Sequence, residues 1–360
     1  MTVLDRRTLN RTLLERQFLL DRTGLPALDV VRRLVAVQGQ EPNWPYVGLW
    51  TRIDGFRHTA LTELFTRRAV VRSTVLRRTQ HVLAAEDFAW LRPTVQPVVS
   101  VALTHSYYAD EIGGIALDAL AKAGRDALTG HTLVRHRLGQ LLAPGFPDRR
   151  PTRLAQAVEL LEPLVHPPPN GVWGAWGHRR ETPVALAEEF TGIPMAGADH
   201  RTMVLRYLAA FGPAGVMDVQ AWSGLTRLRE VTEALRPELR TYRDEHGTEL
   251  FDLPGLPLAD PGRPAPVRFL PAYDNVALGH RDRRRIITDE DRRRIAPNAS
   301  TGVPLFLVDG FVHGSWSLTE EGLRVVPFRD LRQAERAAVQ EEATRLLAFA
   351  APGRDAVVFA

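Results

Sequence analysis

The apolar residues of the first quarter of the chain are spaced first as in helices and then as in strands. They recur every three or four positions over 6–20 and again over 28–37, and a third helix is predicted at 59–65, after the Asp54-Gly55 turn. Residues 69–83 are dense in Val, Thr and Leu with arginines interleaved, which is typical of a β-hairpin. Three helices followed by a hairpin are the order of a winged helix.

The same order of predicted elements recurs twice further along the chain. The expected helices lie at 117–122, 132–142 and 151–161 in the second round, and at 203–210, 216–222 and 225–235 in the third. Strand signals follow each round, and we find no residue-level repeat, so the architecture repeats rather than the sequence. We therefore predict winged-helix modules at 1–110, 111–197 and 198–265.

A different pattern begins after the Pro- and Gly-rich stretch at 254–266, which is typical of a linker. Strands are predicted at 267–270, 302–308, 311–318 and 323–328, with Asp309-Gly310 as a hairpin turn and a closing helix at 331–349. The whole pattern predicts an α+β protein of about three tandem winged-helix modules and a β-rich, barrel-like C-terminal domain at 266–360.

Composition narrows the class of protein further. Of 360 residues, 44% are hydrophobic and 24% charged, the proportions of a globular protein, and no apolar stretch approaches the ~18 residues of a membrane-spanning helix. The first 22 residues lack the apolar core of a secretory signal, so we expect a cytoplasmic protein. The absence of cysteine excludes zinc fingers, iron–sulfur sites and cysteine enzymes, and the histidines stand apart without metal-ligand spacing. We expect neither metal nor cofactor, since no nucleotide-binding glycine motif is present either.

The net charge of +4 is compatible with an acidic partner such as nucleic acid, but it is weak on its own. Lys122 is the only lysine among 46 basic residues, a skew that resembles the composition of a high-GC bacterial genome. Most arginines are therefore expected on solvated faces or in surface ion pairs, and only local clusters deserve a functional interpretation.

Two such clusters stand out. The first lies on the predicted wing between Glu63 and Glu86, contains no acid, and consists of Arg67, Arg68, Arg72, Arg77 and Arg78. Several guanidinium groups on a strand pair would hold a phosphate backbone, although an ordinary exposed hairpin remains an alternative. The second cluster, His280 to Arg294, is basic chiefly through Arg283, Arg284 and Arg285, and its acids leave local ion pairing equally open.

The segment Gln38-Gly39-Gln40 follows an apolar helix and is succeeded by Pro42 and Pro45. Because the prolines end the helix, the two carboxamides project from a fixed base into a loop. They could serve chemistry, or they could simply cap the helix and bond the loop backbone. Spacing does not decide between these interpretations.

Four stretches resemble one known family. They are Leu34-Val35-x-x-Gln38-x-Gln40-x-Pro42-x-x-Pro45-Tyr46-x-Gly48-Leu49-Trp50-x-Arg52, Leu76-Arg77-Arg78-Thr79-Gln80-His81-Val82-Leu83, Phe269-Leu-Pro-Ala-Tyr-Asp274-Asn275 and Val308-Asp-Gly-Phe-Val-His-Gly314-Ser-Trp316. The pattern resembles the bacterial winged-helix DNA glycosylases of the AlkZ-like family, over almost the whole chain. The resemblance implies a C-shaped body that holds DNA on its concave face and excises bulky N7-alkylated purines. Some members unhook interstrand crosslinks as self-resistance to DNA-alkylating natural products.

The resemblance assigns catalysis to Gln38 and Gln40 by position. Thr79 and His81 follow the basic wing and match the family pattern, and we expect them to contact DNA together with the wing arginines and His280; for His81 a hydrogen-bonded structural role remains an alternative. Gly39 departs from the family pattern, in which the middle residue is usually apolar, so the pair would be less rigidly held. An N7-alkylated guanine is already cationic and leaves without a general acid, so two amides that place a water molecule would suffice.

The expected function is therefore a monofunctional DNA glycosylase, a cytoplasmic and bacterial repair enzyme acting on duplex DNA with alkylated purines, without membrane contact and as a monomer. The alternative of another class is a non-catalytic winged-helix DNA-binding transcriptional regulator, whose wings and arginines would look the same. The first requires the amides for base release, whereas the second requires strong preference for one DNA sequence.

Overall fold

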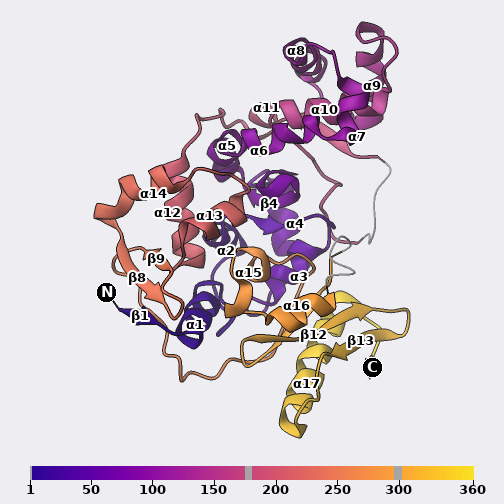
Figure 1. Cartoon of the computed structure of the whole chain (residues 1–360). Coiled ribbons are helices and arrows are strands. Elements are labelled where there is room, and N and C mark those ends of the chain that lie inside the picture. Colours follow the sequence, from indigo (N-terminus) through magenta and orange to yellow (C-terminus); the bar gives the residue numbers. More distant parts are fainter. Residues whose placement is uncertain (1, 175–180, 296–301) are drawn as a thin grey trace.

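The computed structural model describes residues 2–174, 181–295 and 302–360, and it is a mixed α+β protein in which helices predominate (Figure 1). The strands of the described residues form four sheets. The α+β class predicted from the sequence is thereby confirmed.

The first round of elements follows the predicted order of helices and hairpin. It comprises α2 (Ala27–Leu34), β2 (Val37–Gln38), α3 (Trp44–Trp50), α4 (His58–Thr66), β3 (Val70–Thr74) and β4 (Gln80–Ala84), and it is preceded by β1 (Val3–Leu4) and α1 (Arg6–Arg16). Strands β2, β4 and β3 form one antiparallel sheet in that order. The loop predicted after Gln40 is wrong over 44–50, where α3 lies. Pro45 instead occupies the first turn of α3, where no intrahelical N–H is needed.

The same order of elements recurs in two further rounds. The second comprises α8 (Leu117–Leu128), β5 (Leu133–Val134), α9 (Arg135–Leu142), α10 (Pro151–Leu161), β6 (Leu164–Val165) and β7 (Pro183–Leu186). The third comprises α12 (His200–Phe211), α13 (Val216–Ser223), α14 (Arg229–Leu235), β8 (Arg240–Asp244) and β9 (Glu249–Asp252). At the position of β2 and β5 in the first two rounds, the third round has a single antiparallel bridge from Ala214 to Phe251. Strand β1 pairs in parallel with β8 and extends the sheet of the third round.

The remaining short helices lie between the rounds or after the third round. They are α5 (Ala85–Thr94), α6 (Gln96–Ser100), α7 (Ser106–Ile112), α11 (Ala187–Thr191), α15 (Asn275–Leu278) and α16 (Asp289–Ile295), with single 3₁₀ turns at Leu76–Arg78, Val101–Thr104, Ala143–Gly145, Arg236–Glu238 and Arg283–Arg285. The segment 254–266, predicted as a linker, packs on α1: Arg11 Nε donates to the Arg263 carbonyl at 2.6 Å. It therefore anchors the C-terminal part to the start of the chain.

The C-terminal sheet is open. Its strands β10 (Arg268–Leu270), β11 (Leu305–Val308), β12 (Phe311–Leu318), β13 (Gly322–Pro327) and β14 (Ala356–Phe359) are bonded in that order, and α17 (Gln333–Ala350) connects the parallel pair β13 and β14. The predicted turn is confirmed, since Asp309 and Gly310 both have positive φ, at 45° and 81°. The barrel-like form was wrong, because among the described residues β10 and β14 remain edges and do not pair.

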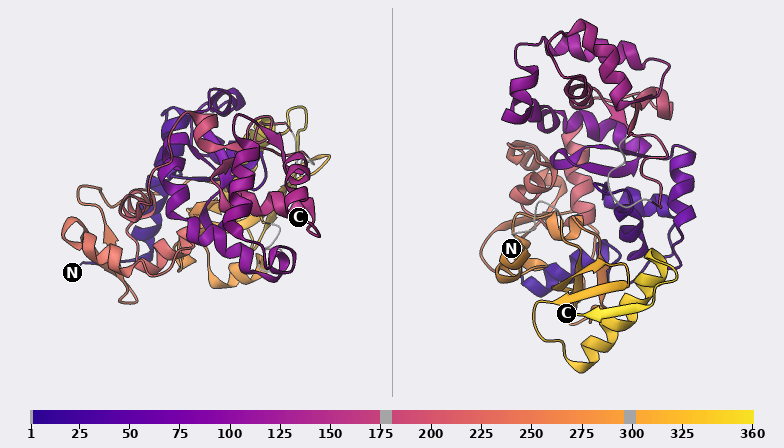
Figure 2. Two further views of the ribbon diagram at one scale, coloured as in Figure 1. Left: turned by 90° about the horizontal axis from the view of Figure 1, so that it is seen from above. Right: turned by 90° about the vertical axis from the view of Figure 1, so that its right-hand side faces the viewer.

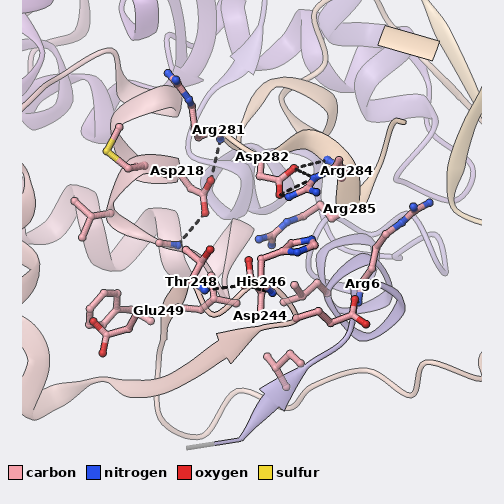
Figure 3. A pocket seen from close by; sticks show the side chains of 18 of the residues that line it. Arg6, Asp218, Asp244, His246, Thr248, Glu249, Arg281, Asp282, Arg284 and Arg285 are labelled. Atoms are coloured by element: carbon pink, nitrogen blue, oxygen red, sulfur yellow. Dashed lines mark hydrogen bonds and ion pairs between the residues drawn. The ribbon is translucent and has the colours of Figure 1, made fainter. Parts of the chain in front are cut away.

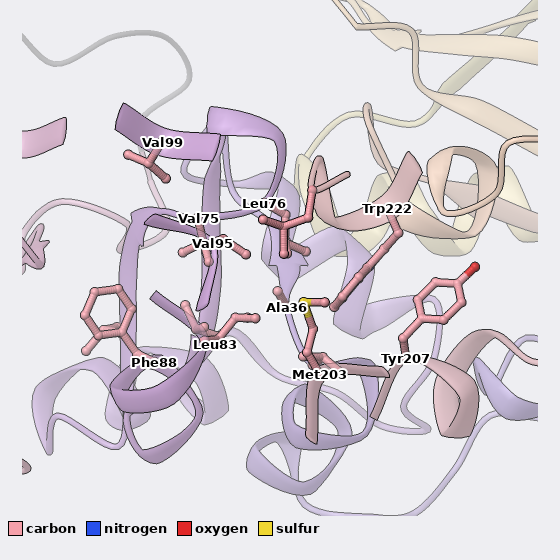
Figure 4. Close-up of a cluster of buried hydrophobic side chains, with 14 of the residues drawn as sticks. Ala36, Val75, Leu76, Leu83, Phe88, Val95, Val99, Met203, Tyr207 and Trp222 are labelled. Atoms are coloured by element: carbon pink, nitrogen blue, oxygen red, sulfur yellow. The ribbon is translucent and has the colours of Figure 1, made fainter. Parts of the chain in front are cut away.

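The first and third rounds share one hydrophobic core. Figure 4 shows Leu76, from the turn between β3 and β4 of the first round, facing Met203 and Trp222 of the third, and Leu76 and Trp222 are both 0% exposed. Burial of this much apolar surface fixes the sheet β2–β4–β3 against α12 and α13. Helices α7 to α10 lie at one end of the molecule and the C-terminal sheet with α17 at the other (Figures 1 and 2). Gln38 and Gln40 belong to the round between these ends.

Candidate active site

The base of the site is the short strand that carries Gln38. Helix α2 ends at Leu34 and is followed by Val35 with φ 67°, an unusual value for a β-branched residue, which turns the chain sharply into β2. Gln38 then pairs with His81 across β2 and β4. Directly opposed residues of an antiparallel pair project from the same face, so the two side chains are neighbours.

The side chain of Gln38 is buried and committed to the loop backbone. It is 4% exposed, and its Oε1 accepts the main-chain N–H groups of Gly39 at 2.7 Å and Gln40 at 3.0 Å. Its Nε2 donates to Thr79 Oγ1 at 3.4 Å. Since both acceptor sites of the carbonyl are used, Gln38 shapes the turn that follows it.

Gln40 differs from its partner. It is half-buried, and its Oε1 accepts one bond, from the Gln80 main-chain N–H at 3.2 Å. Within the part of the chain that the structure describes, its NH2 group has no hydrogen-bond partner. An amide with one free acceptor site and two free donors can hold a water molecule or a sugar oxygen.

His81, which lies opposite Gln38, and its neighbour Gln80 carry two further acceptors. His81 is 0% exposed and donates from Nδ1 to the Thr79 carbonyl at 2.9 Å. Burial, with a smaller contribution from Arg77, lowers the pKa of His81 to about 3, so the ring is neutral and its Nε2 is an acceptor. Neither His81 Nε2 nor Gln80 Oε1 has a partner among the described residues, although buried polar atoms are normally paired.

The five wing arginines divide into two sets. Arg67, Arg68 and Arg78 are exposed, as phosphate contact requires. Arg72 is 6% exposed and bonds the loop carbonyls of residues 39 and 40. Arg77 donates to the Trp222 carbonyl at 2.6 Å and to Asn275 Oδ1 at 2.7 Å. Burial lowers the pKa of both inner arginines to about 10. The protein contacts of this inner pair speak against direct phosphate binding.

The second basic cluster is likewise mixed. His280 is buried, donates from Nε2 to the Phe211 carbonyl at 3.0 Å, and is kept neutral by a pKa that burial lowers to about 3. Arg285 is 7% exposed and bonds the Pro213 carbonyl, while Arg284 pairs with Asp282 at 2.6 Å. Arg283 is half-buried and has no partner among the described residues, so of the three arginines it is the one available to a ligand.

The C-terminal segment 269–275 contacts the elements on both sides of the glutamine loop, a role that the sequence did not predict. Asp274 forms two bonds with Arg52, at 2.8 and 2.9 Å, and both side chains are buried. Asn275 Nδ2 donates to the Ala36 carbonyl at 2.9 Å, just before β2. The segment is one of the four stretches that carry the family resemblance, but its residues alone do not show that it contacts the loop.

One pocket lies away from the glutamine pair, and neither Gln38 nor Gln40 lines it (Figure 3). It is formed where β1, the β8–β9 turn and residues 281–285 meet, and Arg6, Arg281 and Arg284 face it beside Asp244 and Asp282. The mixed charges give it no single preferred ligand. Over residues 2–174, 181–295 and 302–360, no three His, Asp or Glu side chains gather as metal ligands, and no helix is long and apolar enough to cross a membrane.

Three comparisons relate the chain to known proteins. The profile of the family described as DNA glycosylase AlkZ-like matches residues 31–349. An interstrand DNA cross-link repair glycosylase of Streptomyces sahachiroi is 23% identical over 372 residues, which cover 92% of this chain and 93% of that protein. The solved structure of the Streptomyces sahachiroi DNA glycosylase AlkZ superposes with a TM-score of 0.80 at 21% identity, over 100% of both chains. The family resemblance seen in the sequence is thereby confirmed.

Proposed function

The chain belongs to the AlkZ-like DNA glycosylase family, and on that premise we propose that it hydrolyses the N-glycosidic bond of bulky N7-alkylated purines in duplex DNA. The observation that carries the proposal is the unequal setting of the two glutamines. The buried Gln38 holds the loop backbone, and the half-buried Gln40 keeps donors and an acceptor site unused among the described residues. An amide with unused donors and an acceptor site, on a loop whose backbone is held by its neighbour, can place a water molecule.

The reaction needs no group that exchanges a proton with the base. Alkylation at N7 leaves the guanine positively charged, so when the bond to C1′ breaks the base takes the electron pair and departs neutral. The water oxygen bonds to C1′ as an oxocarbenium-like centre develops, and its proton passes to solvent. Gln40 contributes by orienting that water, and well-placed reactants gain several kcal/mol over free diffusion.

This division of roles also gives selectivity. A neutral guanine is a poor leaving group, and an amide can neither protonate it nor deprotonate water. Ordinary DNA therefore stays intact without a tight pocket around each base. The crosslink named for the Streptomyces sahachiroi relative fits the same class, because a crosslinked N7 position carries the same charge. We extend the proposal to such crosslinks, and to self-resistance against the agents that make them.

The three rounds of helices and strands support a second part of the proposal. We assign each round to a winged-helix module, arranged as a C-shaped body that holds the duplex as a monomer. The exposed Arg67, Arg68 and Arg78, with the half-buried Arg283, would contact phosphates. Such an enzyme would work in the bacterial cytoplasm, on the nucleoid.

The test is base release from a duplex that carries one N7-alkylguanine. The protein should liberate the alkylated base and leave an abasic site whose strand breaks only after alkali or heat, while an unmodified duplex stays intact. Gln40→Ala should lose release but keep duplex binding. The proposal would be overturned if the unaltered protein released no base. It would also be overturned if the protein cleaved the strand during release through a covalent Schiff base that a reductant can trap.

A further inference from the structure

We infer that Arg72 is a positioning residue for base excision, which fixes the loop that carries Gln40 and ties it to the second round of elements. The inference rests on the proposed function and goes beyond it, because it assigns a role to a side chain that does not reach solvent. It also replaces the phosphate contact that the sequence predicted for this arginine.

The guanidinium of Arg72 grips two consecutive peptide carbonyls. From β3, its Nε donates to the Gly39 carbonyl at 2.9 Å and its Nη2 to the Gln40 carbonyl at 3.1 Å. These two oxygens flank the residue whose amide acts in the proposed reaction. The planar, five-donor fork of arginine suits such a two-carbonyl contact, whereas lysine offers a compact charge on a flexible stem.

The third arm of the fork reaches the second round. Arg72 Nη1 donates to Asn170 Oδ1 at 2.5 Å and lies 3.3 Å from His166 Nδ1. The opposite ring nitrogen of His166 donates to Glu159 at 3.0 Å, and the His166 main-chain N–H donates to the Arg72 carbonyl at 2.9 Å. His166, which is itself bonded to Glu159, therefore contacts both the backbone and the side chain of Arg72.

The approach of the two segments is close enough to constrain the sequence. Gly171 has φ +87°, and a Cβ built there would lie 3.3 Å from Arg72 Cδ and 3.1 Å from Phe65 Cζ. A side chain at this position would meet both strain and crowding. The glycine thus permits the 166–171 turn to close over the arginine.

Burying this charge is unfavourable, and the structure compensates for it within the protein. Arg72 is 6% exposed and its hydrogen-bond partners are neutral, while the carboxylates of Glu41 and, more weakly, Glu159 stabilise its charge from a distance. A phosphate could not reach the guanidinium without opening the turn. All the donor contacts are instead made to the loop and to the segment that covers it.

The consequence for Gln40 is a main chain held from two sides. Gln38 Oε1 accepts its N–H, and Arg72 donates to its carbonyl. Loss of the arginine frees the carbonyl side and lets the amide shift, and a misplacement of about 1 Å in a catalytic group can cost ~100-fold in rate.

The experiment compares Arg72→Gln with the unaltered protein in single-turnover release of N7-alkylguanine, at saturating protein. We expect the rate constant to fall about 10- to 100-fold with the duplex dissociation constant and its salt dependence unchanged. An unchanged rate constant would overturn the inference, and so would weaker binding with a salt slope smaller by about one, the signature of a phosphate contact.

Arg92→Gln provides the matched control. Arg92 is also buried, at 1% exposed, has a pKa that burial lowers to about 10, and donates to the Leu160 and Glu162 carbonyls rather than to the loop. It should lose stability as Arg72→Gln does and keep the rate constant wherever both proteins are folded. If both substitutions slow release alike, the effect is general destabilisation and the inference fails.

Arg72→Lys separates geometry from charge. It should be nearly as slow as Arg72→Gln, because the single nitrogen of an ammonium cannot keep the contacts that three separate guanidinium nitrogens make to the two carbonyls and to Asn170. Full activity in Arg72→Lys would contradict the positioning role. Should both Arg72 variants fail to fold, Asn170→Ala loosens the third arm alone and should slow release severalfold, and an unchanged rate there would overturn the inference. Failure of the unaltered protein to release base would instead count against the proposed function itself.

Discussion

The side-chain oxygen of Gln38 accepts the main-chain N–H of Gln40 at 3.0 Å, so the first glutamine of the pair builds the turn that presents the second. The sequence allowed two interpretations of these amides, as chemical groups or as caps of the loop backbone. The structure favours the second for Gln38, which is 4% exposed, and leaves the first open for Gln40. The pair is therefore not two equivalent groups.

The two glutamines should respond differently to truncation. Gln38→Ala leaves the N–H groups of Gly39 and Gln40 without their acceptor, so we expect the free energy of unfolding to fall by about 1 to 3 kcal/mol together with excision. Gln40→Ala removes one bond at a half-buried position and should cost less stability while it abolishes release. Urea unfolding alongside single-turnover assays measures both quantities, and equal losses of stability would contradict the assigned roles.

The excision rate constant should be nearly flat between about pH 6 and 9. The pKa of His81 lies near 3 and that of Arg72 near 10, so neither changes charge in this range. Below this range the stability of the fold should become limiting. The folded pKa of His81 is lower than its ordinary value of about 6.5, so the unfolded chain binds the proton first. The free energy of unfolding therefore falls as the pH decreases from about 6.5 towards 3. A bell-shaped profile centred near neutrality would instead require a general base.

Exposed wing arginines should affect binding rather than chemistry. Arg67→Ala is expected to weaken duplex binding for every sequence and to reduce the slope of log affinity against log salt by about one. Titrations of a labelled duplex at several salt concentrations measure this slope. Lys122→Ala, which removes a positive charge paired with Asp126 on α8, is the control for net charge. An identical change in both variants would show that only the overall charge matters.

Gly39→Ala should be tolerated. A Cβ at this position would lie 3.4 Å from Val82 Cγ2, an ordinary contact at the tight end of the range, and the residue does not have a positive φ. We expect excision within severalfold of the unaltered rate and an unfolding free energy up to about 1 kcal/mol higher, since alanine has fewer unfolded conformations. Loss of activity with retained fold would mean that the loop needs the glycine in order to move during the reaction.

Local patterns predicted the elements better than the contacts between them. The strand signal at 311–318 predicted β12 to the residue, and Asp309-Gly310 predicted its turn, because both signals depend on neighbours in the chain. Helix α3 was missed because Pro45 stops a helix in its interior and permits one in its first turn. The open form of the C-terminal sheet could not be predicted, because its edge strand β14 pairs with β13 across the whole of α17, and local patterns do not show such a distant pairing.

The site shows the same limit. The Gln-x-Gln pattern located the loop, but it could not tell that one amide faces the backbone. Charge counting grouped Arg72 with Arg67, although β3 turns the former inward, against the loop and the segment 166–171. Partners such as Asn170, which is 98 positions away from Arg72, cannot be predicted from the charge of a local stretch.

The most direct test of the central claim is single-turnover release from a duplex with one N7-alkylguanine, with Gln40→Ala and an otherwise identical unmodified duplex as controls. The account predicts rapid liberation of the alkylated base by the unaltered protein, none from the unmodified duplex, and loss of release in Gln40→Ala with its duplex affinity retained. Equal release by the unaltered protein and Gln40→Ala would contradict it.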